Sequence, residues 1–307
     1  MEPSATRVIS PTHGPSGRRR LRHDNLTAFL SVLPMIAFIL AITVYPTLNA
    51  LFHSFTKWDG IHVEFIGLDN YAQIAKDPRF WQLLLNTLIY VSTVPVQILI
   101  ALFIMVLLYE KLPGWRFFRS LFYLPNVLSP IIIGLIFRQA FMWEGPINAF
   151  FKANHLNWLV LDWLSKGPTA MGVILIAIIW NNFGYGVVLF LAGATMIDPC
   201  VFEAALLDGA NWFQKTFRIF LPLLGRVIAF FSVTTIIWIF TGLFGLIFAI
   251  TKGGPGYDTT TLEYMIYLNA FKAGGKMGYA CALAVYLFVI TFGISRISML
   301  VTDRSDR

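Results

Sequence analysis

Six long apolar stretches dominate this sequence and limit the folds open to it. They lie at about residues 27–52, 83–108, 119–141, 170–194, 227–250 and 278–300. Each is long enough to cross a hydrocarbon core, which takes roughly 20 residues of helix. With 57% hydrophobic residues, 13% charged residues and a mean hydropathy of +0.69, the chain lies outside the usual range of soluble domains. Backbone groups in lipid must be hydrogen-bonded within the protein, and these stretches are too long for barrel strands. The sequence therefore predicts an all-α, polytopic membrane protein with six transmembrane helices.

The positions of Lys and Arg predict the orientation of these helices. Six spans divide the loops between two sides, and the side with both termini holds 14 of the 23 basic residues. The opposite side holds eight, and Arg138 is left near the end of a span. Because Lys and Arg accumulate on the cytoplasmic side, we expect both termini there. The basic run Gly17–Arg22 then indicates a topology and lipid-headgroup signal rather than a nucleic-acid site.

This topology gives a simple domain organisation. Residues 1–26 form a basic cytoplasmic segment, residues 27–300 form the six-helix transmembrane domain, and residues 301–307 form a cytoplasmic tail. Within the transmembrane domain, residues 196–224 form a cytoplasmic loop between the fourth and fifth spans.

The chain lacks the residues that several kinds of transport and catalysis require. No Asp, Glu or Lys lies in the central part of a span, whereas ion-coupled carriers usually need such a group. The nearest approach to a phosphate-binding loop, "GGKMG" at 274–278, lacks the required Gly and Ser or Thr. Neither HExxH nor GxSxG occurs. We therefore expect a chain that is not an enzyme, binds no metal or cofactor, and receives energy from a partner.

Uncharged polar residues are the groups left inside the predicted spans. The densest cluster is "WNNFGYG", Trp180–Gly186. Such amides are costly in hydrocarbon unless they face a partner or a water-filled path. They can bind a neutral, hydroxyl-rich solute, or they can hydrogen-bond another helix, and the sequence leaves both interpretations open. The candidates for a solute path within this cluster are Trp180, Asn181, Asn182 and Tyr185. Weaker candidates elsewhere in the spans are Gln97, Asn126, Thr234, Thr235, Trp238 and Thr241.

Residues 198–224 predict a bent pair of helices. Asp198 is a good N-cap and Pro199 suits the first helical position. Asp208 and Gly209 should break this first helix, because Gly readily takes the left-handed conformation. A second helix should begin near Asn211, carry an aromatic face, and end or bend at Pro222; that face would consist of Trp212, Phe213, Phe217 and Phe220. The residues alone favour equally a helix lying on lipid headgroups and a docking element for another protein.

This segment resembles the EAA motif of bacterial ABC importer permeases, and the match rests on Glu203, Ala204, Ala205, Asp208, Gly209, Ala210, Ile219, Leu221 and Pro222. Two further segments, Phe65–Thr87 and Ile250–Phe271, resemble the carbohydrate-uptake branch related to the maltose permeases. The resemblance extends over residues 27–300. The sequence departs from the pattern at Lys252, where a third Gly is common, and it lacks the large inserted periplasmic domain of the longer maltose permease.

The resemblance implies roles for these residues. The bent helix would be the coupling helix, which docks in a cleft of an ATPase subunit. Glu203 would make a polar or ionic contact there, Ala204 and Ala205 would permit close approach, and Gly209 would set the bend. Phe213 and Phe217 are the packing residues we expect at that contact. The ATPase-coupling set is then Glu203, Ala204, Ala205, Asp208, Gly209, Ala210, Phe213, Phe217, Ile219 and Pro222.

The resemblance also implies an assembly in the bacterial cytoplasmic membrane. A second homologous permease would complete the pore, and two ATPase subunits would bind ATP and Mg. An extracytoplasmic solute-binding protein would deliver the solute to loops 53–82, 142–169 and 251–277.

Three functions follow as hypotheses. The first is the permease subunit of an ATP-binding cassette importer that moves a di- or oligosaccharide by alternating access. The second has the same architecture but carries glycerol phosphate or a related polyol phosphate. That solute calls for a cation facing the path, and Arg138 is the candidate within the spans. The third is a secondary carrier or channel, which would need neither ATP nor a binding protein.

Overall fold

The computed structural model describes residues 29–304 except 112, 273 and 274; the predicted basic segment 1–26 lies outside the described residues. The side chains of Leu206 and of residues 298–304 are not described. The chain divides into two compact units, Met1–Phe52 and His53–Arg307. Each unit is considered by itself below.

The described part of the first unit is one apolar helix. The helix runs from Phe29 to His53, one residue beyond the end of this unit, and includes a π-helical stretch, η1 (Leu40–Val44), followed by α2 (Tyr45–His53). Its apolar side chains are exposed along most of its length. Pro46 has no N–H to donate to the carbonyl of Ile42, which fits the wider helical turn just before it. This helix corresponds to the first predicted span.

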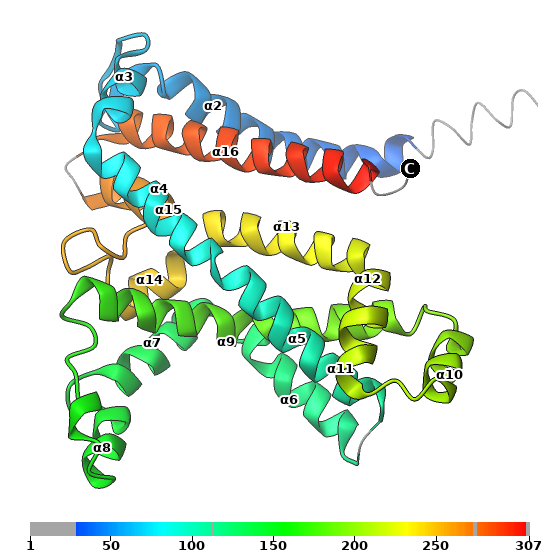
Figure 1. Ribbon diagram of the computed structural model, residues 1–307. Helices are drawn as coiled ribbons and strands as arrows, with labels where there is room; N and C mark the ends of the chain where they lie inside the picture. Colours follow the sequence, from blue (N-terminus) through cyan, green and yellow to red (C-terminus); the bar gives the residue numbers. More distant parts are fainter. Residues whose placement is uncertain (1–28, 112, 273–274, 305–307) are drawn as a thin grey trace, which may run out of the picture. The chain divides into compact units, whose positions relative to one another are not determined.

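The second unit is mostly helical (Figure 1). Its elements are β1 (Thr56–Trp58), β2 (Val63–Phe65), α3 (Asp69–Lys76), α4 (Pro78–Val91), α5 (Thr93–Tyr109), α6 (Trp115–Val127), α7 (Pro130–Phe141), α8 (Pro146–Ala153), η2 (Asn157–Leu159), α9 (Gly167–Ala194), α10 (Pro199–Leu207), α11 (Trp212–Gln214), η3 (Lys215–Phe220), α12 (Leu221–Leu223), α13 (Gly225–Thr241), α14 (Phe244–Ile250), α15 (Leu262–Tyr267), η4 (Leu268–Lys272) and α16 (Met277–Arg304). The antiparallel hairpin β1–β2 pairs Lys57 with Glu64, and the sequence did not predict it.

The apolar helices fit a membrane protein. Among the described residues of both units, four helices are long and apolar enough to cross a membrane, and the number rises to six if each of two bent helix pairs counts as one span. The four are Phe29–His53, Pro78–Tyr109, Gly167–Ala194 and Met277–Ile297. The structure thus agrees with several predicted spans but divides the third and the fifth.

The third predicted span, 119–141, is not one helix. α6 ends at Val127, α7 begins at Pro130, and the pieces Trp115–Val127 and Pro130–Ala153 meet at 95°. Pro130 disfavours helical geometry at Ser129, whose ψ is 136°. The prediction of a continuous helix was wrong because this proline sets a boundary inside an uninterrupted apolar run.

The fifth predicted span, 227–250, is divided in a similar way. α13 ends at Thr241 and α14 begins at Phe244. Any Cβ at Gly242 would lie 2.7 Å from the indole ring of Trp238, so a side chain at this position would clash. The carboxylate of Glu263 accepts a hydrogen bond from the Phe244 N–H at 2.9 Å and thereby stabilises the first turn of α14.

α9 is the central helix of this unit. α5 and α6 pack along it, and α7, α13 and α14 contact it as well (Figure 1). Gly184 allows the closest approach, because a Cβ there would overlap the carbonyl oxygen of Phe122 in α6. Gly186 similarly lies against Ala101 of α5 and Phe231 of α13. The two glycines thus let three helices gather around the middle of α9.

One face of α4 fixes a distant loop. Gln82, Asn86 and Tyr90 recur every four residues and therefore lie on one side of the helix. The Gln82 amide donates to the Asp258 carboxylate at 3.2 Å. The Asn86 amide donates to the carbonyls of residues 257 and 260 at 3.0 Å, and the Tyr90 hydroxyl donates to that of residue 259 at 3.0 Å. These bonds hold residues 257–260 against α4.

Replacing Gly184 by Ala should destabilise the protein, because the new methyl group would push α6 away from α9. Gly172 lies on the same helix with open space around its Cα, so Gly172→Ala is the matched control. We expect Gly184→Ala to lower the melting temperature of detergent-solubilised protein by several degrees, as overpacking does. Gly172→Ala should leave it unchanged or raise it slightly. Equal melting temperatures for the two variants would contradict this packing.

Glu263 should make stability depend on pH. Burial raises the pKa of its carboxyl from 4.5 to about 7, and the hydrogen bonds from the backbone of residues 243 and 244 only partly oppose this. The folded state therefore holds a proton between about pH 4.5 and 7 that the unfolded state has lost, so stability falls as the pH rises through that range. Between pH 5 and pH 8, measured by thermal unfolding, the wild type should lose more stability than Glu263→Gln. Parallel losses in the two proteins would contradict the assignment.

Candidate functional site

The segment 198–224 begins with the predicted cap. The Asp198 carboxylate accepts a hydrogen bond from the Cys200 N–H at 2.9 Å, and this bond lowers the pKa of the carboxyl. Pro199 is the first residue of α10. The predicted start of the first helix is confirmed.

The predicted break and restart are confirmed as well. α10 ends at Leu207, and Gly209 has φ +70°, in the left-handed region that favours glycine. Asn211 then caps α11: its side chain accepts from the Gln214 N–H at 2.9 Å, and the Gln214 side chain accepts from the Asn211 N–H at 2.8 Å. The two helices are thus joined by an elbow whose backbone groups are well satisfied.

The predicted bend at Pro222 occurs two residues later. The second helix continues through η3 and α12 to Leu223, and the pieces Trp212–Leu223 and Gly225–Thr241 meet at 75°. Pro222 lies in the first positions of α12, where its missing N–H is tolerated. The segment therefore connects directly to α13 through a single sharp bend at residue 224.

The inner face of this segment packs against the end of α5. Tyr109, Phe202 and Phe220 form a ring cluster with centroid distances of 4.9 to 5.2 Å. Trp212 contacts Phe103 edge-on at 5.0 Å. An ion pair between Lys215 and the Glu110 carboxylate of the same region measures 3.4 Å. The segment is therefore anchored to the second span.

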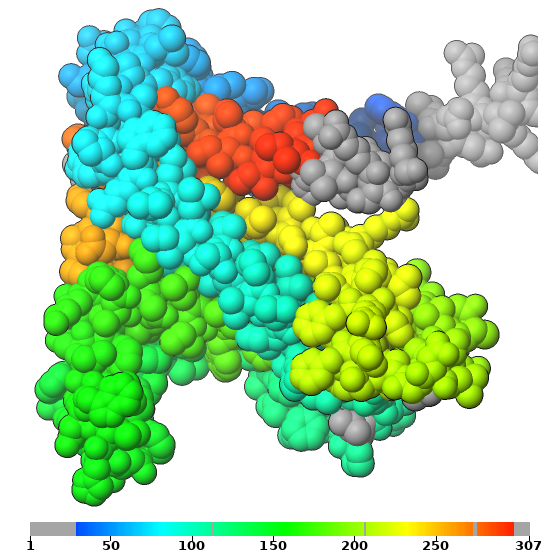
Figure 2. All heavy atoms as spheres, viewed as in Figure 1, coloured from blue at the N-terminus to red at the C-terminus, as the bar shows by residue number. Residues whose placement is uncertain are grey.

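Its outer face is exposed (Figure 2). Leu207 is 90% exposed, Phe213 67% and Phe217 47%, and Glu203 and Ala204 are exposed beside them. Asp208, Gly209 and Pro222 are exposed as well, whereas Ala205 is buried and Ala210 and Ile219 are half-buried. The prediction of one aromatic face was wrong, because Trp212 and Phe220 face α5 while Phe213 and Phe217 face outward.

Five of the proposed solute-path residues form a polar network among α5, α6, α9 and α13. Asn182 donates to Gln97 Oε1 and to Thr235 Oγ1, both at 3.2 Å. Its own side-chain oxygen accepts from Asn126 at 3.5 Å, and the adjacent Asn181 donates to the Pro125 carbonyl at 3.0 Å. Gln97, Asn181, Asn182 and Thr235 are buried. In this structure these amides hydrogen-bond other helices, which was one of the two interpretations left open.

The remaining solute-path candidates stand apart from this network. Trp180 packs on Phe137 at 5.7 Å, Tyr185 packs on Phe231 at 5.8 Å, and Trp238 lies over Gly242. The hydroxyls of Thr234 and Thr241 bond carbonyls of their own helix. Arg138 lies exposed on α7, beside a hollow of about 740 Å³.

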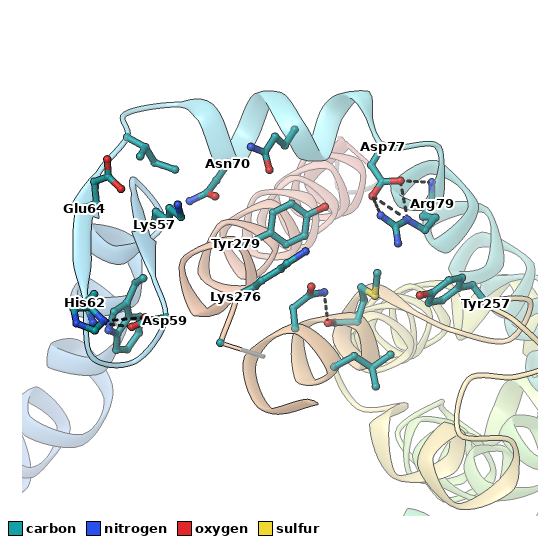
Figure 3. Close-up of a pocket in the computed structure, with 17 residues that line it drawn as sticks. Lys57, Asp59, His62, Glu64, Asn70, Asp77, Arg79, Tyr257, Lys276 and Tyr279 are labelled. Atoms are coloured by element: carbon teal, nitrogen blue, oxygen red, sulfur yellow. Dashed lines mark hydrogen bonds and ion pairs between the residues drawn. The ribbon is translucent and has the colours of Figure 1, made fainter. Parts of the chain in front are cut away.

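A second hollow, which we call the hairpin pocket, was not foreseen. It has a volume of about 750 Å³ and lies between the β1–β2 hairpin with α3 and the segment 257–279 (Figure 3). Its lining residues are Lys57, Trp58, Asp59, His62, Glu64, Ile66, Asn70, Gln73, Asp77, Arg79, Tyr257, Met265, Leu268, Asn269, Gly275, Lys276 and Tyr279. The sequence marked both loops as external but gave no sign that they meet. Neither in this pocket nor elsewhere do the described residues contain a cluster of three His, Cys, Asp or Glu side chains suited to a metal ion.

Comparisons with known proteins agree with this architecture. Residues 71–305 match the family described as "Binding-protein-dependent transport system inner membrane component". The lactose transport system permease protein LacF of Rhizobium radiobacter is 32% identical over 89% of this chain and 92% of its own. The sn-glycerol-3-phosphate transport system permease protein UgpA of Yersinia enterocolitica is 30% identical over 91% of this chain and 95% of its own. A bacterial alginate ABC transporter, solved with an alginate pentasaccharide-bound periplasmic protein, has a chain of the same fold, with a TM-score of 0.79, 22% identity and coverage of 93% of this chain and 96% of that one.

Replacing Asn182 by Leu should destabilise the helix bundle, because Gln97 and Thr235 would lose their common donor. We expect a loss of about 1 kcal/mol, typical of polar contacts between membrane helices, and a lower melting temperature. Asn154→Leu is the control, since its amide bonds only the Phe150 carbonyl at an exposed end of α8. If both variants melt like the wild type, the network does not hold these helices together.

Proposed function

The chain belongs to the family of binding-protein-dependent transport system inner membrane components, and we propose that it is a permease subunit that imports a neutral sugar, of di- or oligosaccharide size, by alternating access. The chain catalyses no bond change, because ATP hydrolysis in this family is performed by separate ATPase subunits. The single observation that carries the mechanism is the direct connection from the 198–224 segment to α13, which bears Thr235 of the buried polar network.

Force applied to the segment would reach the network in two steps. The segment is anchored to α5 by aromatic contacts and by the Lys215–Glu110 ion pair, so it moves with the ends of two helices. α13 and α5 both supply partners to Asn182. Closure of an ATPase dimer against the exposed face of α10 would therefore shift the helices that meet at Asn182. The amides of the network would then exchange their helix partners for the hydroxyls of a solute.

The assembly we propose has the partners that the sequence implied. A second homologous permease completes the pore, and two ATPase subunits that bind ATP and Mg dock on the outer face of the 198–224 segment. A solute-binding protein docks at the opposite end of the spans, on loops 53–82, 142–169 and 251–277. Both termini and the segment are then cytoplasmic, and the chain crosses the bacterial cytoplasmic membrane six times. The ATPase-coupling roles of Glu203 and its neighbours are part of the same proposal.

A polyol phosphate is the alternative solute, and the similarity to UgpA favours it. It requires a cation at the solute path. The network residues are all uncharged, and Arg138 lies exposed on α7 without a part in the network. LacF, with a sugar in its name, is similar to the same extent. The uncharged network favours the neutral sugar, and a carrier or channel independent of ATP would lack a role for the exposed segment.

Transport by the reconstituted complex tests this function. Proteoliposomes with both permeases, the ATPase subunits and the binding protein should take up lactose, maltotriose or raffinose only when ATP and the binding protein are present. Sugar uptake in the absence of both ATP and the binding protein would indicate a carrier or channel. Uptake of glycerol 3-phosphate alone would establish the phosphate alternative.

Glu203→Lys should separate coupling from folding. Because Glu203 lies on the exposed face of α10, the variant should reach the membrane normally but lose about tenfold in uptake, as a loss of about 1.4 kcal/mol in docking would produce. Glu203→Gln keeps a polar side chain at the same exposed position without reversing its charge, and it should lose less uptake than Glu203→Lys. Wild-type uptake by Glu203→Lys would contradict the docking role.

A further inference from the structure

The hairpin pocket is a concave surface beside α3 (Figure 3), and its walls are fixed by hydrogen bonds and close backbone contacts. Asn70 of α3 fixes the hairpin, because its amide donates to the carbonyls of residues 54 and 56, both at 2.9 Å. Strand β1 rests on the start of α16, where a Cβ at Gly278 would overlap the Thr56 carbonyl oxygen. The turn at Gly275, with φ +81°, also lies close to the hairpin, because a Cβ there would lie 2.9 Å from the Asp59 carbonyl oxygen. The two walls of the pocket are thus held together by backbone contacts.

Opposite charges balance in the lining of the pocket. Lys57, Arg79 and Lys276 contribute three cations, and Asp59, Glu64 and Asp77 contribute three anions (Figure 3). Arg79 pairs with the Asp77 carboxylate at 2.8 Å, and this pairing lowers the pKa of that carboxyl. Asp59 accepts the backbone N–H groups of residues 61 and 62 at 2.8 and 2.7 Å. Because the lining has no net charge, the pocket offers a ligand hydrogen-bond donors and acceptors but does not attract ions of one sign.

Aromatic and amide groups complete the lining. Trp58, Tyr257 and Tyr279 supply three aromatic side chains, and Gln73 and Asn269 supply amides. Trp58 is held in place by stacking on His53, with ring centroids 3.9 Å apart, and the Arg79 guanidinium lies 5.9 Å from the centre of the Tyr257 ring. The rings can cover the C–H faces of a sugar, while the amides and charged groups can bond its hydroxyls.

We propose that the hairpin pocket binds a neutral oligosaccharide, separately from the buried polar network, as the solute arrives at this chain. The inference rests on the proposed function and names a site for the same class of solute. The volume of about 750 Å³ lies in the range of small-molecule sites. A phosphate or carboxylate ligand would require an excess of cations, which the balanced lining does not supply.

Direct binding to the assembled complex tests this site. Lactose, maltotriose and raffinose are added one at a time to the complex of permeases and ATPase subunits in lipid nanodiscs, without the binding protein, and saturation transfer to the sugar protons is measured by NMR. At least one sugar should receive saturation from the wild type. Trp58→Ala and Lys276→Gln should each weaken its apparent affinity by about tenfold, the effect of losing one good aromatic or polar contact.

Two matched variants serve as controls. Trp158→Ala and Lys166→Gln remove the same side-chain types at exposed positions outside the pocket, and they should leave the signal unchanged. Basal ATPase activity and gel filtration establish that each variant is folded. Lys276 is exposed and has no ion pair within the described residues, so Lys276→Gln keeps the test valid if Trp58→Ala fails to fold.

Four results would overturn the site. The first is the absence of a signal from all three sugars, and the second is an equal signal in the pocket and control variants. The third is displacement of the sugar by glycerol 3-phosphate. The fourth is a pocket variant whose ATPase is no longer stimulated by the binding protein but whose sugar signal is unchanged. The last result would make the pocket a docking surface for that protein. ATP-dependent sugar uptake by the wild type together with any of these results means that the pocket assignment fails while the proposed function stands. Absence of sugar uptake means that the function itself fails.

Discussion

Polar groups inside a membrane protein must find their partners within the bundle, and in this chain that requirement centres on Asn182. Its amide bonds side chains of α5 and α13, and its oxygen accepts from α6. Such bonds form only because the helices approach closely, and Gly184 and Gly186 provide that approach two and four residues further along α9. The small residues and the amides of "WNNFGYG" therefore act together: the glycines bring the helices near, and the amides give them a defined relative position.

The same network explains how a remote surface can influence the middle of the bundle. The 198–224 segment ends in a 75° bend that leads into α13, and its inner aromatic face rests on the end of α5. Two of the helices bonded to Asn182 thus begin or end at the segment. A network of neutral amides can exchange partners at little cost in charge desolvation, whereas a buried ion pair could not. This fits the proposed gate for an uncharged solute, which must open and close again.

The sequence was informative where one residue type determines the local backbone. Asp198, Gly209 and Asn211 predicted the cap, the break and the restart of the 198–224 segment correctly, because capping and left-handed glycine are local effects. Apolar length located the spans, but it gave no sign of the breaks at residues 128–129 and 242–243. The first break depends on Pro130, which was visible but was placed inside a span, and the second lies at Gly242, where a Cβ would clash with the Trp238 ring. The hairpin pocket joins residues about 200 positions apart, as Asn70 and Asn269 illustrate, and no local pattern predicts such an encounter.

Chemical labelling of Cys200 measures directly whether an ATPase covers the outer face of α10, as we propose. Cys200 is exposed, and it lies three residues before Glu203. In a Cys281→Ser background Cys200 is the single cysteine of the chain, so the rate at which a maleimide labels it in inside-out vesicles reports on that face alone. We expect rapid labelling of the permeases without their ATPase subunits and strong protection once the ATPase subunits are bound. Equal labelling rates with and without the ATPase subunits would contradict the proposal.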